Sequence, residues 1–471
     1  MHSVREGGTH GYHEAATGGE ALLLTLRAAA AAVLRANDAG RWTIPASRIY
    51  PHQWNWDSAL CSLGWAEIDP GRAWTELESL VGGRARDGML PHIAFRRREH
   101  GPGREGPVLG RVAVFHRTSY LPGAAWWGDR RGVDGRPISG ITQPPLAATC
   151  LRLVLERVPD ERRATRLLWP LHEWHRFLLR ERDPDGLGEP VLIHPWESGR
   201  DNAPEWDRPL FRVEPRLMYV RRRDTAHIDA AERPSAEHYK RYLTLVVQGT
   251  DAGWPQRRLA ASGPFRVLDP GFSAVLARAC HDLSEVAGAL GSDEIAGESA
   301  EFAERVAGAL RRRAGAGGGI TALDLVDGSA LDAPSAGPAL AVLAPGVDRA
   351  TVEHTGHLLV RELASRWGVR SYAERGPAWS PRNYWRGPVW ANLTWLCALG
   401  FELHGETERA EALRAQVLRF AEEAGMREYA DPRTGHGLGA RRFSWTAALT
   451  LRVLAEQGAR EQLPSNSDGP S

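Results

Sequence analysis

The sequence predicts an all-α protein whose helices form a double-layered barrel. About a dozen helical stretches follow one another in pairs, and several are apolar on more than one face, which is typical of helices buried between other helices. Strand candidates are few and short, so a doubly wound α/β sheet is excluded. With 42% hydrophobic residues among 471, the chain holds enough apolar material for one large core.

The helices are identified by apolar residues that recur at a spacing of three to four. They are predicted over residues 19–36, 57–67, 71–82, 145–157, 161–182, 236–249, 271–290, 292–313, 349–366, 387–404, 406–424 and 444–457. Asp69 and Asp269 each precede a proline, the form of an N-cap before the first helical turn. Short strands are expected at residues 320–326 and in a glycine-rich hairpin around 434–438.

These elements predict one domain over residues 19–460, because barrel folds of this length often form a single domain. Residues 1–18 and 461–471 lack periodicity and are expected to be disordered tails. Two long connections stand out: residues 96–140 are rich in Arg, Gly and Pro, and residues 202–235 carry many charges. Long loops within a compact domain are usually functional or disordered. We expect both to cover a cup at one end of the barrel.

The net charge indicates which classes of partner to expect, and the apolar runs and the cysteines indicate the cellular compartment. Lys plus Arg minus Asp plus Glu is 59 − 58 = +1, which gives no electrostatic reason to expect nucleic acid or an anionic membrane as partner. The apolar run at 21–34 is interrupted by Arg27, and no run reaches the roughly 18 residues of a spanning helix. We expect a cytoplasmic protein; the oligomeric state, a homo-oligomer included, stays open. Four cysteines in apolar helical runs are expected to be buried free thiols: Cys61, Cys150, Cys280 and Cys397.

No cofactor or metal is predicted. GPGREG at 101–106 spells GxGxxG, but no strand precedes it and no helix follows it. His354 and His357 share a helix face without a third ligand, so a solvated face is the better interpretation.

Tryptophan points to a carbohydrate site. The 18 copies exceed the usual share, and many lie between helices beside Tyr, Gln, Asn, Asp or Glu. A sugar ring needs a flat apolar surface for its C–H face and polar side chains for its hydroxyls. Any single tryptophan is as often a core residue, but four such clusters together favour a sugar site. The clusters are residues 50–59, 139–145, 194–207 and 384–395, and a fifth element at 427–449 adds a carboxylate before a glycine-rich turn.

Cleavage of a glycosidic bond needs two carboxyl groups, one protonated and one ionised. Glu428, in the fifth element, is one candidate. Any lone acid is by default a surface charge. Spacing alone does not choose among the remaining candidates, which are Asp57, Glu197, Asp201, Glu205 and Asp207.

Five motifs in order carry a family resemblance: WNWDSA, SGITQPP, WESGRDNAPEWD, YWRGPVW, and EYADPRTGHG followed by FSWTAA. They resemble glycoside hydrolase family 63, and within it the bacterial glucosylglycerate and mannosylglycerate hydrolase branch, over about residues 36–455. The resemblance implies an (α/α)6 barrel with long active-site loops and a few short β-hairpins. It also implies an inverting hydrolase of a small α-glycoside, above all glucosylglycerate or mannosylglycerate.

The resemblance also assigns roles to individual residues. It makes Asp201 the general acid and Glu428 the general base, and inversion requires the two carboxyls to lie roughly 6.5–9.5 Å apart, with water between sugar and base. Apolar surroundings, including Trp196, are expected to keep Asp201 protonated. The residues implied to line the sugar subsite are Tyr50, Trp56, Gln143, Trp196, Tyr384, Trp385, Gly387 and Trp390.

Three residues are implied to hold the carboxylate of the aglycone: Tyr120, Arg233 and Tyr239. An Arg fork can clamp a carboxylate through two hydrogen bonds. The sequence departs from the family pattern in two places near this subsite. Phe443 stands where the glucosylglycerate enzymes have Gln, and residues 96–119 are longer and more basic than in close relatives.

Other functions stay open at this stage, and so does the choice between glucose and mannose. Within the same class, an α-glucosidase acting on a neutral di- or oligosaccharide is the alternative. An arginine that binds a carboxylate, as Arg233 is expected to do, would have no role with a neutral aglycone. Sugar epimerases also use (α/α)6 barrels but depend on facing histidines. A non-catalytic sugar-binding protein would not need Asp201 and Glu428 together.

Overall fold

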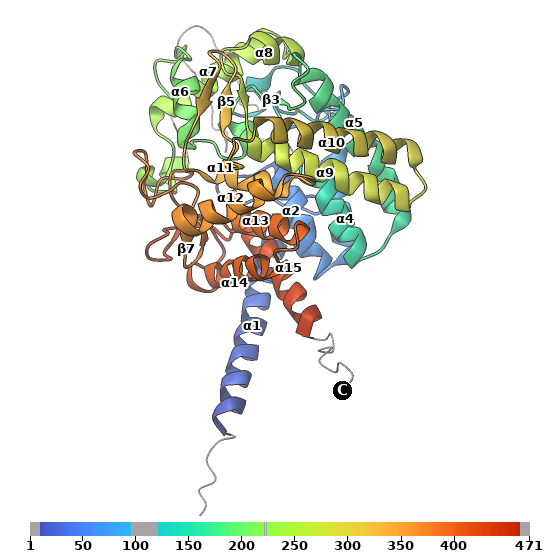
Figure 1. The fold of residues 1–471 in the computed structure, drawn as a ribbon, viewed down its shortest axis with the longest axis vertical. Coiled ribbons are helices and arrows are strands. Elements are labelled where there is room, and N and C mark those ends of the chain that lie inside the picture. The colour runs from blue at the N-terminus through green and yellow to red at the C-terminus, as the bar shows by residue number, and fades with distance from the viewer. Residues whose placement is uncertain (1–9, 96–120, 221, 223, 462–471) are drawn as a thin grey trace, which may run out of the picture.

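Most of the long helices pack in two layers, and the N-terminal helix projects from the rest of the fold (Figure 1). The computed structural model describes residues 10–95, 121–220, 222 and 224–461. The longer helices are α1 (His10–Ala36), α2 (Asn55–Ala66), α3 (Pro70–Gly82), α4 (Ala147–Arg157), α5 (Glu161–Glu181), α7 (Ala236–Asp251), α9 (Pro270–Ala289), α10 (Asp293–Arg313), α12 (Arg349–Leu358), α13 (Ala391–Leu403), α14 (Thr407–Glu423) and α15 (Ser444–Glu461). Shorter helices are α6 (Asp207–Phe211), α8 (Gln256–Ser262) and α11 (Ala336–Ala339).

Within the described residues, α2, α4, α9, α11, α13 and α15 form a closed inner ring. Each packs against the next, with the turn after α11 (Leu340–Leu343) contacting both α9 and α13, and α15 returns to α2. The outer helices α1, α3, α5, α10, α12 and α14 cover this ring, each packed against inner helices. The alternation of outer and inner helices along the chain gives the (α/α)6 architecture that the sequence led us to expect.

Two inner helices, α2 and α13, are buried on all faces because they pack against other elements on both sides. Every residue of α2 is buried, and α13 is buried from Ala391 to Phe401. The four cysteines lie on the inner helices α2, α4, α9 and α13 and are buried and free, as predicted. Burial raises the pKa of each thiol, which makes them inert apolar residues.

The predicted helix starts are confirmed at two caps. The Asp69 side chain accepts a hydrogen bond from the backbone N–H of Arg72, and Asp269 accepts one from Gly271. The inner helices α2, α4, α13 and α15 begin at the same end of the ring, where the loops before them meet.

Strands are short and lie outside the helical layers. β3 (Val191–Leu192), β4 (Val267–Leu268), β5 (Ala322–Asp324) and β6 (Ser329–Leu331) form one antiparallel sheet. β9 (Arg427–Ala430) and β10 (Gly437–Arg441) form a hairpin with an irregularity between Leu438 and Arg441. Both predicted strand regions are therefore confirmed. Two further pairs are β1 (Gln53–Trp54) with β2 (Ile93–Ala94), and β7 (Ala364–Ser365) with β8 (Gly368–Val369).

Four helix ends differ from the prediction by four residues or more, among them that of α15, which continues to Glu461 instead of ending at residue 457. α1 begins at His10, within the segment that we expected to be irregular, where Glu14, Ala15 and Ala16 favour helix. The helix predicted over 349–366 ends at Leu358 and passes through a wider turn, because β7 pairs with β8 instead. The helix predicted over 387–404 begins at Ala391, because the backbone of Val389 pairs with that of Ala430.

The long connections are only partly described. Residues 96–120, which contain most of the first, lie outside the described residues. The second connection, 202–235, contains α6 and three single 3-10 turns. Among the described helices none is long and apolar enough to cross a membrane.

Candidate active site

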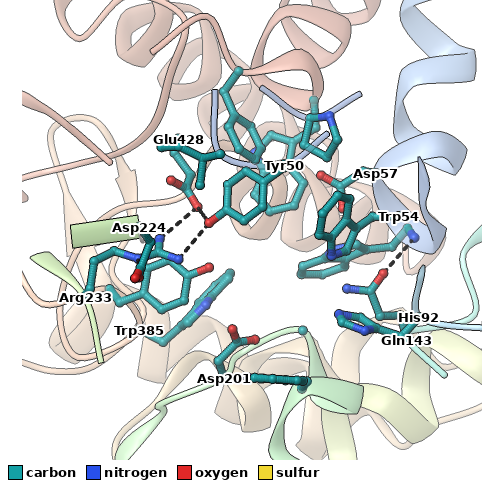
Figure 2. A pocket seen from close by; sticks show the side chains of 18 of the residues that line it. Tyr50, Trp54, Asp57, His92, Gln143, Asp201, Asp224, Arg233, Trp385 and Glu428 are labelled. Carbon is teal, nitrogen blue, oxygen red and sulfur yellow. Dashed lines mark hydrogen bonds and ion pairs between the residues drawn. The ribbon is translucent and has the colours of Figure 1, made fainter. Parts of the chain in front are cut away.

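A cavity of about 260 Å³ opens at the end of the ring where the inner helices begin (Figure 2). Its walls combine tryptophan and tyrosine rings with four carboxyl groups and several cations. The lining residues are Pro45, Arg48, Ile49, Tyr50, Trp54, Trp56, Asp57, His92, Leu121, Gln143, Trp196, Gly199, Asp201, Arg222, Asp224, His227, Arg233, Tyr239, Tyr384, Trp385, Glu428, Phe443 and Trp445.

Asp201 is presented to the cavity by a tightly anchored loop. The neighbouring Arg200 is buried, donates to the carboxylates of Glu205 and Asp269, and so ties the loop to the start of α9. The phenol of Tyr242 donates to the Asp201 carbonyl oxygen at 2.9 Å. The backbone is thus fixed on both sides, while the Asp201 side chain stays partly exposed to the cavity.

A glycine lets the same loop pack against an aromatic wall. Gly199 has φ +70°, a conformation that favours glycine, and closes the short helical turn Pro195–Ser198. A Cβ at this position would lie 2.5 Å from the Trp56 ring. The absence of a side chain therefore allows the loop that carries Asp201 to lie directly against Trp56.

Glu428 lies on β9, across the cavity from Asp201 (Figure 2). It is 1% exposed and accepts three hydrogen bonds. The Tyr50 hydroxyl donates to Oε1 at 2.9 Å, Arg233 Nη1 donates to Oε1 at 3.4 Å, and the Ala440 N–H donates to Oε2 at 2.8 Å. Three donors on two oxygens form a setting that suits an ionised carboxylate.

The irregularity in the β9–β10 hairpin creates room for this carboxylate. Gly439 has φ +65°, and a Cβ there would lie 2.6 Å from Glu428 Oε2 and 2.4 Å from the Tyr429 ring. The bulge turns the next N–H, that of Ala440, toward Oε2. A glycine at this position is therefore required for the observed geometry of Glu428.

The carboxyl groups that line the cavity differ in the protonation state that their surroundings favour. Burial raises the pKa of Asp201 to about 8; the Arg233 cation opposes this rise, and the Glu428 charge adds to it. Burial also raises the pKa of Asp57 well above its usual range, and the charges of Glu428 and Asp201 add to that rise. With a pKa of about 8, Asp201 is protonated at neutral pH, opposite a Glu428 that accepts three hydrogen bonds, and burial also favours the neutral form of Asp57.

The other acids left open by spacing serve the scaffold. Glu197 is buried and pairs with Arg182 at 2.6 Å. Glu205 pairs with Arg200, and Asp207 pairs with Arg386 outside the cavity. Of the candidates, only Asp57, Asp201 and Glu428 line the cavity, together with Asp224, which the sequence analysis had not singled out.

The structure brings together most of the predicted sugar-subsite residues. Those that line the cavity are Tyr50, Trp56, Gln143, Trp196, Tyr384 and Trp385. Trp390 lies behind the wall, where its ring stacks on Trp385 at 3.7 Å and fixes it. Gly387 also lies outside the lining, and a Cβ there would meet the Ser380 carbonyl oxygen at 2.5 Å. Both residues belong to the motif but support the wall from behind.

Of the three residues predicted to hold a carboxylate, Arg233 and Tyr239 line the cavity, and Tyr120 lies outside the described residues. The sequence analysis selected neither Arg222 nor His92, whose pKa burial lowers well below its usual range. No short motif marks either residue; only the fold brings them to the cavity. Phe443 lines the cavity too, with its ring edge-on to Tyr50.

Arg233 is buried and already has partners. Its Nε donates to Asp224 Oδ2 at 3.1 Å, while Nη1 and Nη2 face Glu428 and Tyr50. Asp224 in turn accepts from Arg222 Nη2 at 2.5 Å and from the Tyr239 hydroxyl at 3.4 Å. Burial acts to raise the pKa of Asp224, but the Arg233 and Arg222 cations outweigh it and hold the pKa below its usual range. An ionised internal carboxylate thus lies among the residues expected to bind a substrate carboxylate.

The described residues contain no group of three or more His, Cys, Asp or Glu side chains that could hold a metal ion. The side chains that line the described site are carboxyl groups, phenols, arginines, histidines, an amide and aromatic and aliphatic walls.

Known proteins share this architecture. A family model described as the mannosylglycerate hydrolase MGH1-like glycoside hydrolase domain matches residues 50–446. A mannosylglycerate hydrolase from Thermus thermophilus is 40% identical over 440 residues, which cover 89% of this chain and 98% of that protein. A glucosylglycerate hydrolase from Mycolicibacterium hassiacum is 34% identical over 460 residues, 91% of this chain and 97% of that protein.

A solved structure extends the similarity to three dimensions. The family 63 mannosylglycerate hydrolase from Thermus thermophilus in complex with Tris and D-glycerate matches with a TM-score of 0.81 at 38% identity. The match covers 91% of this chain and 99% of that chain. The predicted (α/α)6 fold is thereby confirmed.

We expect Gly439→Ala to reduce release of free sugar from a glycoside substrate by about 10²-fold, because the new Cβ displaces the Glu428 carboxylate and small displacements of catalytic groups cost about that much. Gly405→Ala is the matched control: Gly405 has φ +75°, and a Cβ there meets nothing within 4 Å. Turnover and melting temperature are measured for both variants. Equal loss of turnover in both variants would assign the effect to backbone strain and contradict the collision.

Proposed function

Since the chain belongs to the family of mannosylglycerate hydrolase MGH1-like glycoside hydrolases and is itself a glycoside hydrolase, we propose that it hydrolyses a small α-glycoside of glycerate with inversion at the anomeric carbon. The observation that carries the proposal is the pair Asp201 and Glu428 on opposite sides of an aromatic cavity. One carboxyl is protonated by burial, and the other accepts hydrogen bonds from three donors.

In the proposed reaction Asp201 donates its proton to the glycosidic oxygen as the bond from that oxygen to C1 breaks. Glu428 accepts a proton from a water molecule, whose oxygen attacks C1 from the opposite face. The products are the free sugar, with inverted configuration, and the organic acid. Afterwards Asp201 is ionised and Glu428 protonated, and exchange with solvent restores both.

The aglycone end of the cavity supports an acidic leaving group. Arg222, Arg233 and Tyr239 surround the carboxylate of Asp224, which provides a set of partners that a glycerate carboxylate also requires. Phe443 takes the place of an amide, so we propose that charge rather than amide hydrogen bonding selects the aglycone. The relatives include both mannosylglycerate and glucosylglycerate hydrolases, which supports these two sugars as candidates.

Proton NMR tests the function directly. The enzyme is incubated with mannosylglycerate, glucosylglycerate and the neutral glucoside trehalose, and the anomer released in the first minutes is recorded. We expect β-sugar first, from an acidic glycoside, and a loss of turnover of about 10² to 10⁴-fold in Asp201→Asn and in Glu428→Gln. Early α-sugar would contradict inversion, and cleavage of trehalose alone would contradict the acidic aglycone.

The pH dependence follows from the protonation of Asp201. With a pKa of about 8, Asp201 carries its proton below that pH and loses it above. A general acid works only when protonated, so kcat/KM, which reports the free enzyme, is expected to fall as the pH rises through about 8. Initial rates on the cleaved acidic glycoside between pH 5 and 10 measure this limb. A rate that still increases above pH 9 would remove Asp201 from the role of acid.

Asp224 is expected to compete with the aglycone for Arg222 and Arg233. Asp224→Asn removes the competing charge, so the inhibition constant of D-glycerate is expected to fall roughly tenfold, about the effect of one charge-assisted hydrogen bond. Glycerol, which has no carboxylate, should inhibit both forms equally. Asp229→Asn is the control, because Asp229 lies on the same segment but pairs with Arg382 at the surface. Weaker glycerate inhibition in Asp224→Asn would mean that Asp224 supports the subsite.

A further inference from the structure

The guanidinium of Arg233 has two sides with different partners. Its Nε side faces Asp224, toward the proposed aglycone subsite, at 3.1 Å. Its Nη side faces the catalytic centre, where Nη2 donates to the Tyr50 hydroxyl at 2.8 Å and Nη1 donates to Glu428 Oε1 at 3.4 Å. The contact with Glu428 spans 195 residues of sequence and links the connection 202–235 to β9.

Tyr50 completes a triangle with these two groups. Its hydroxyl accepts a hydrogen bond from Arg233 and donates one to Glu428 Oε1, so the phenol connects the guanidinium to the carboxylate. The Arg233 cation also lies 4.2 Å from the centre of the Tyr384 ring. Arg233, Tyr50 and Glu428 are all buried, and each contacts the other two.

We propose that Arg233 and Tyr50 are positioning residues of Glu428, a role separate from any contact with the aglycone. The inference rests on the proposed function, in which Glu428 is the general base. Oε2 is fixed by the backbone N–H of Ala440, and Oε1 is fixed by Tyr50 and Arg233. The direction of the carboxylate toward the attacking water is set by both ends together. A base that acts on water gains its efficiency from such orientation.

A residue that only clamps the aglycone and a residue that positions the base differ in one measurable respect. A clamp contributes nothing when the leaving group has no carboxylate. A positioning residue contributes to every substrate, because every substrate needs the activated water. The α-glycosyl fluorides of mannose and glucose separate the two roles, since fluoride has no carboxylate and leaves with little help from an acid.

The experiment measures kcat and KM for these two fluorides in the wild-type enzyme, Arg233→Met, Arg233→Lys and Tyr50→Phe. We expect kcat to fall about 10²-fold in Arg233→Met and roughly tenfold in Tyr50→Phe, with KM nearly unchanged. Arg233→Lys keeps the positive charge but not the planar guanidinium with its paired donors, so kcat should fall less than in Arg233→Met. Arg212→Met is the control, because Arg212 pairs with Asp324 and Asp327 and does not line the cavity.

The pattern of the kinetic constants distinguishes positioning from general loosening of the site. Loosening raises KM as well as lowering kcat, whereas loss of positioning lowers kcat alone. Partial rescue of kcat in Arg233→Lys is expected if the charge beside Glu428 holds the carboxylate.

The outcomes separate the inference from the function on which it rests. A wild-type enzyme that hydrolyses neither fluoride would overturn the hydrolytic function and the inference with it. A wild-type enzyme that hydrolyses a fluoride, with Arg233→Met and Tyr50→Phe within about twofold of its rate, would leave the function intact and overturn the positioning role. Tyr50→Phe preserves the ring and Arg233, so it decides the question even where melting curves show that Arg233→Met has not folded.

Discussion

Three of the four carboxyl groups that line the cavity share one largely buried space with the buried Arg233, and the rest of the site follows from this constraint. Asp57, Asp201 and Glu428 cannot all ionise in one buried space, because each charge raises the cost of the next. Asp201 and Glu428 differ in their partners: Glu428 accepts hydrogen bonds from Tyr50, Arg233 and Ala440, whereas within the described part of the chain the Asp201 side chain accepts none from another residue. Two chemically identical groups thereby acquire the opposite protonation states that acid and base catalysis requires.

This division requires that the carboxyls stay in place, and the scaffold achieves that with backbone anchors. The loop that carries Asp201 is tied to α9 through Arg200, and Gly199 lets it pack against Trp56. The hairpin that carries Glu428 places a bulge at Gly439, so that a backbone N–H meets the carboxylate. Both anchors lie beside the first turns of inner helices, where the closed ring leaves the backbone little freedom. The double-layered barrel is thus the rigid support on which short loops fix the charges.

The sequence predicted the parts of the molecule that depend on periodicity and on long motifs. The inner and outer helices and the buried cysteines follow from apolar spacing, the caps at Asp69 and Asp269 follow from an Asp before a proline, and the proposed catalytic pair follows from motif resemblance. The contact between Arg233 and Glu428 has no such signal, because it joins two loops 195 residues apart. The motifs also did not show which residues line the cavity and which pack behind that lining. Trp390 stacks behind Trp385 instead of facing the cavity.

The position of Asp224 suggests how an acidic substrate can enter without disturbing the protonation states. With Asp201 neutral, and with the neutral form of Asp57 favoured by burial, the charges nearest Arg233 are those of Glu428, Asp224 and Arg222, and they balance in pairs. An additional carboxylate would leave this cluster with an uncompensated negative charge. A substrate carboxylate that replaces Asp224 leaves the local charge unchanged, so acid and base keep their states through binding. On the proposed function, selectivity then arises from exchange of one carboxylate for another, and a neutral aglycone, which has no charge to exchange, leaves Asp224 in place.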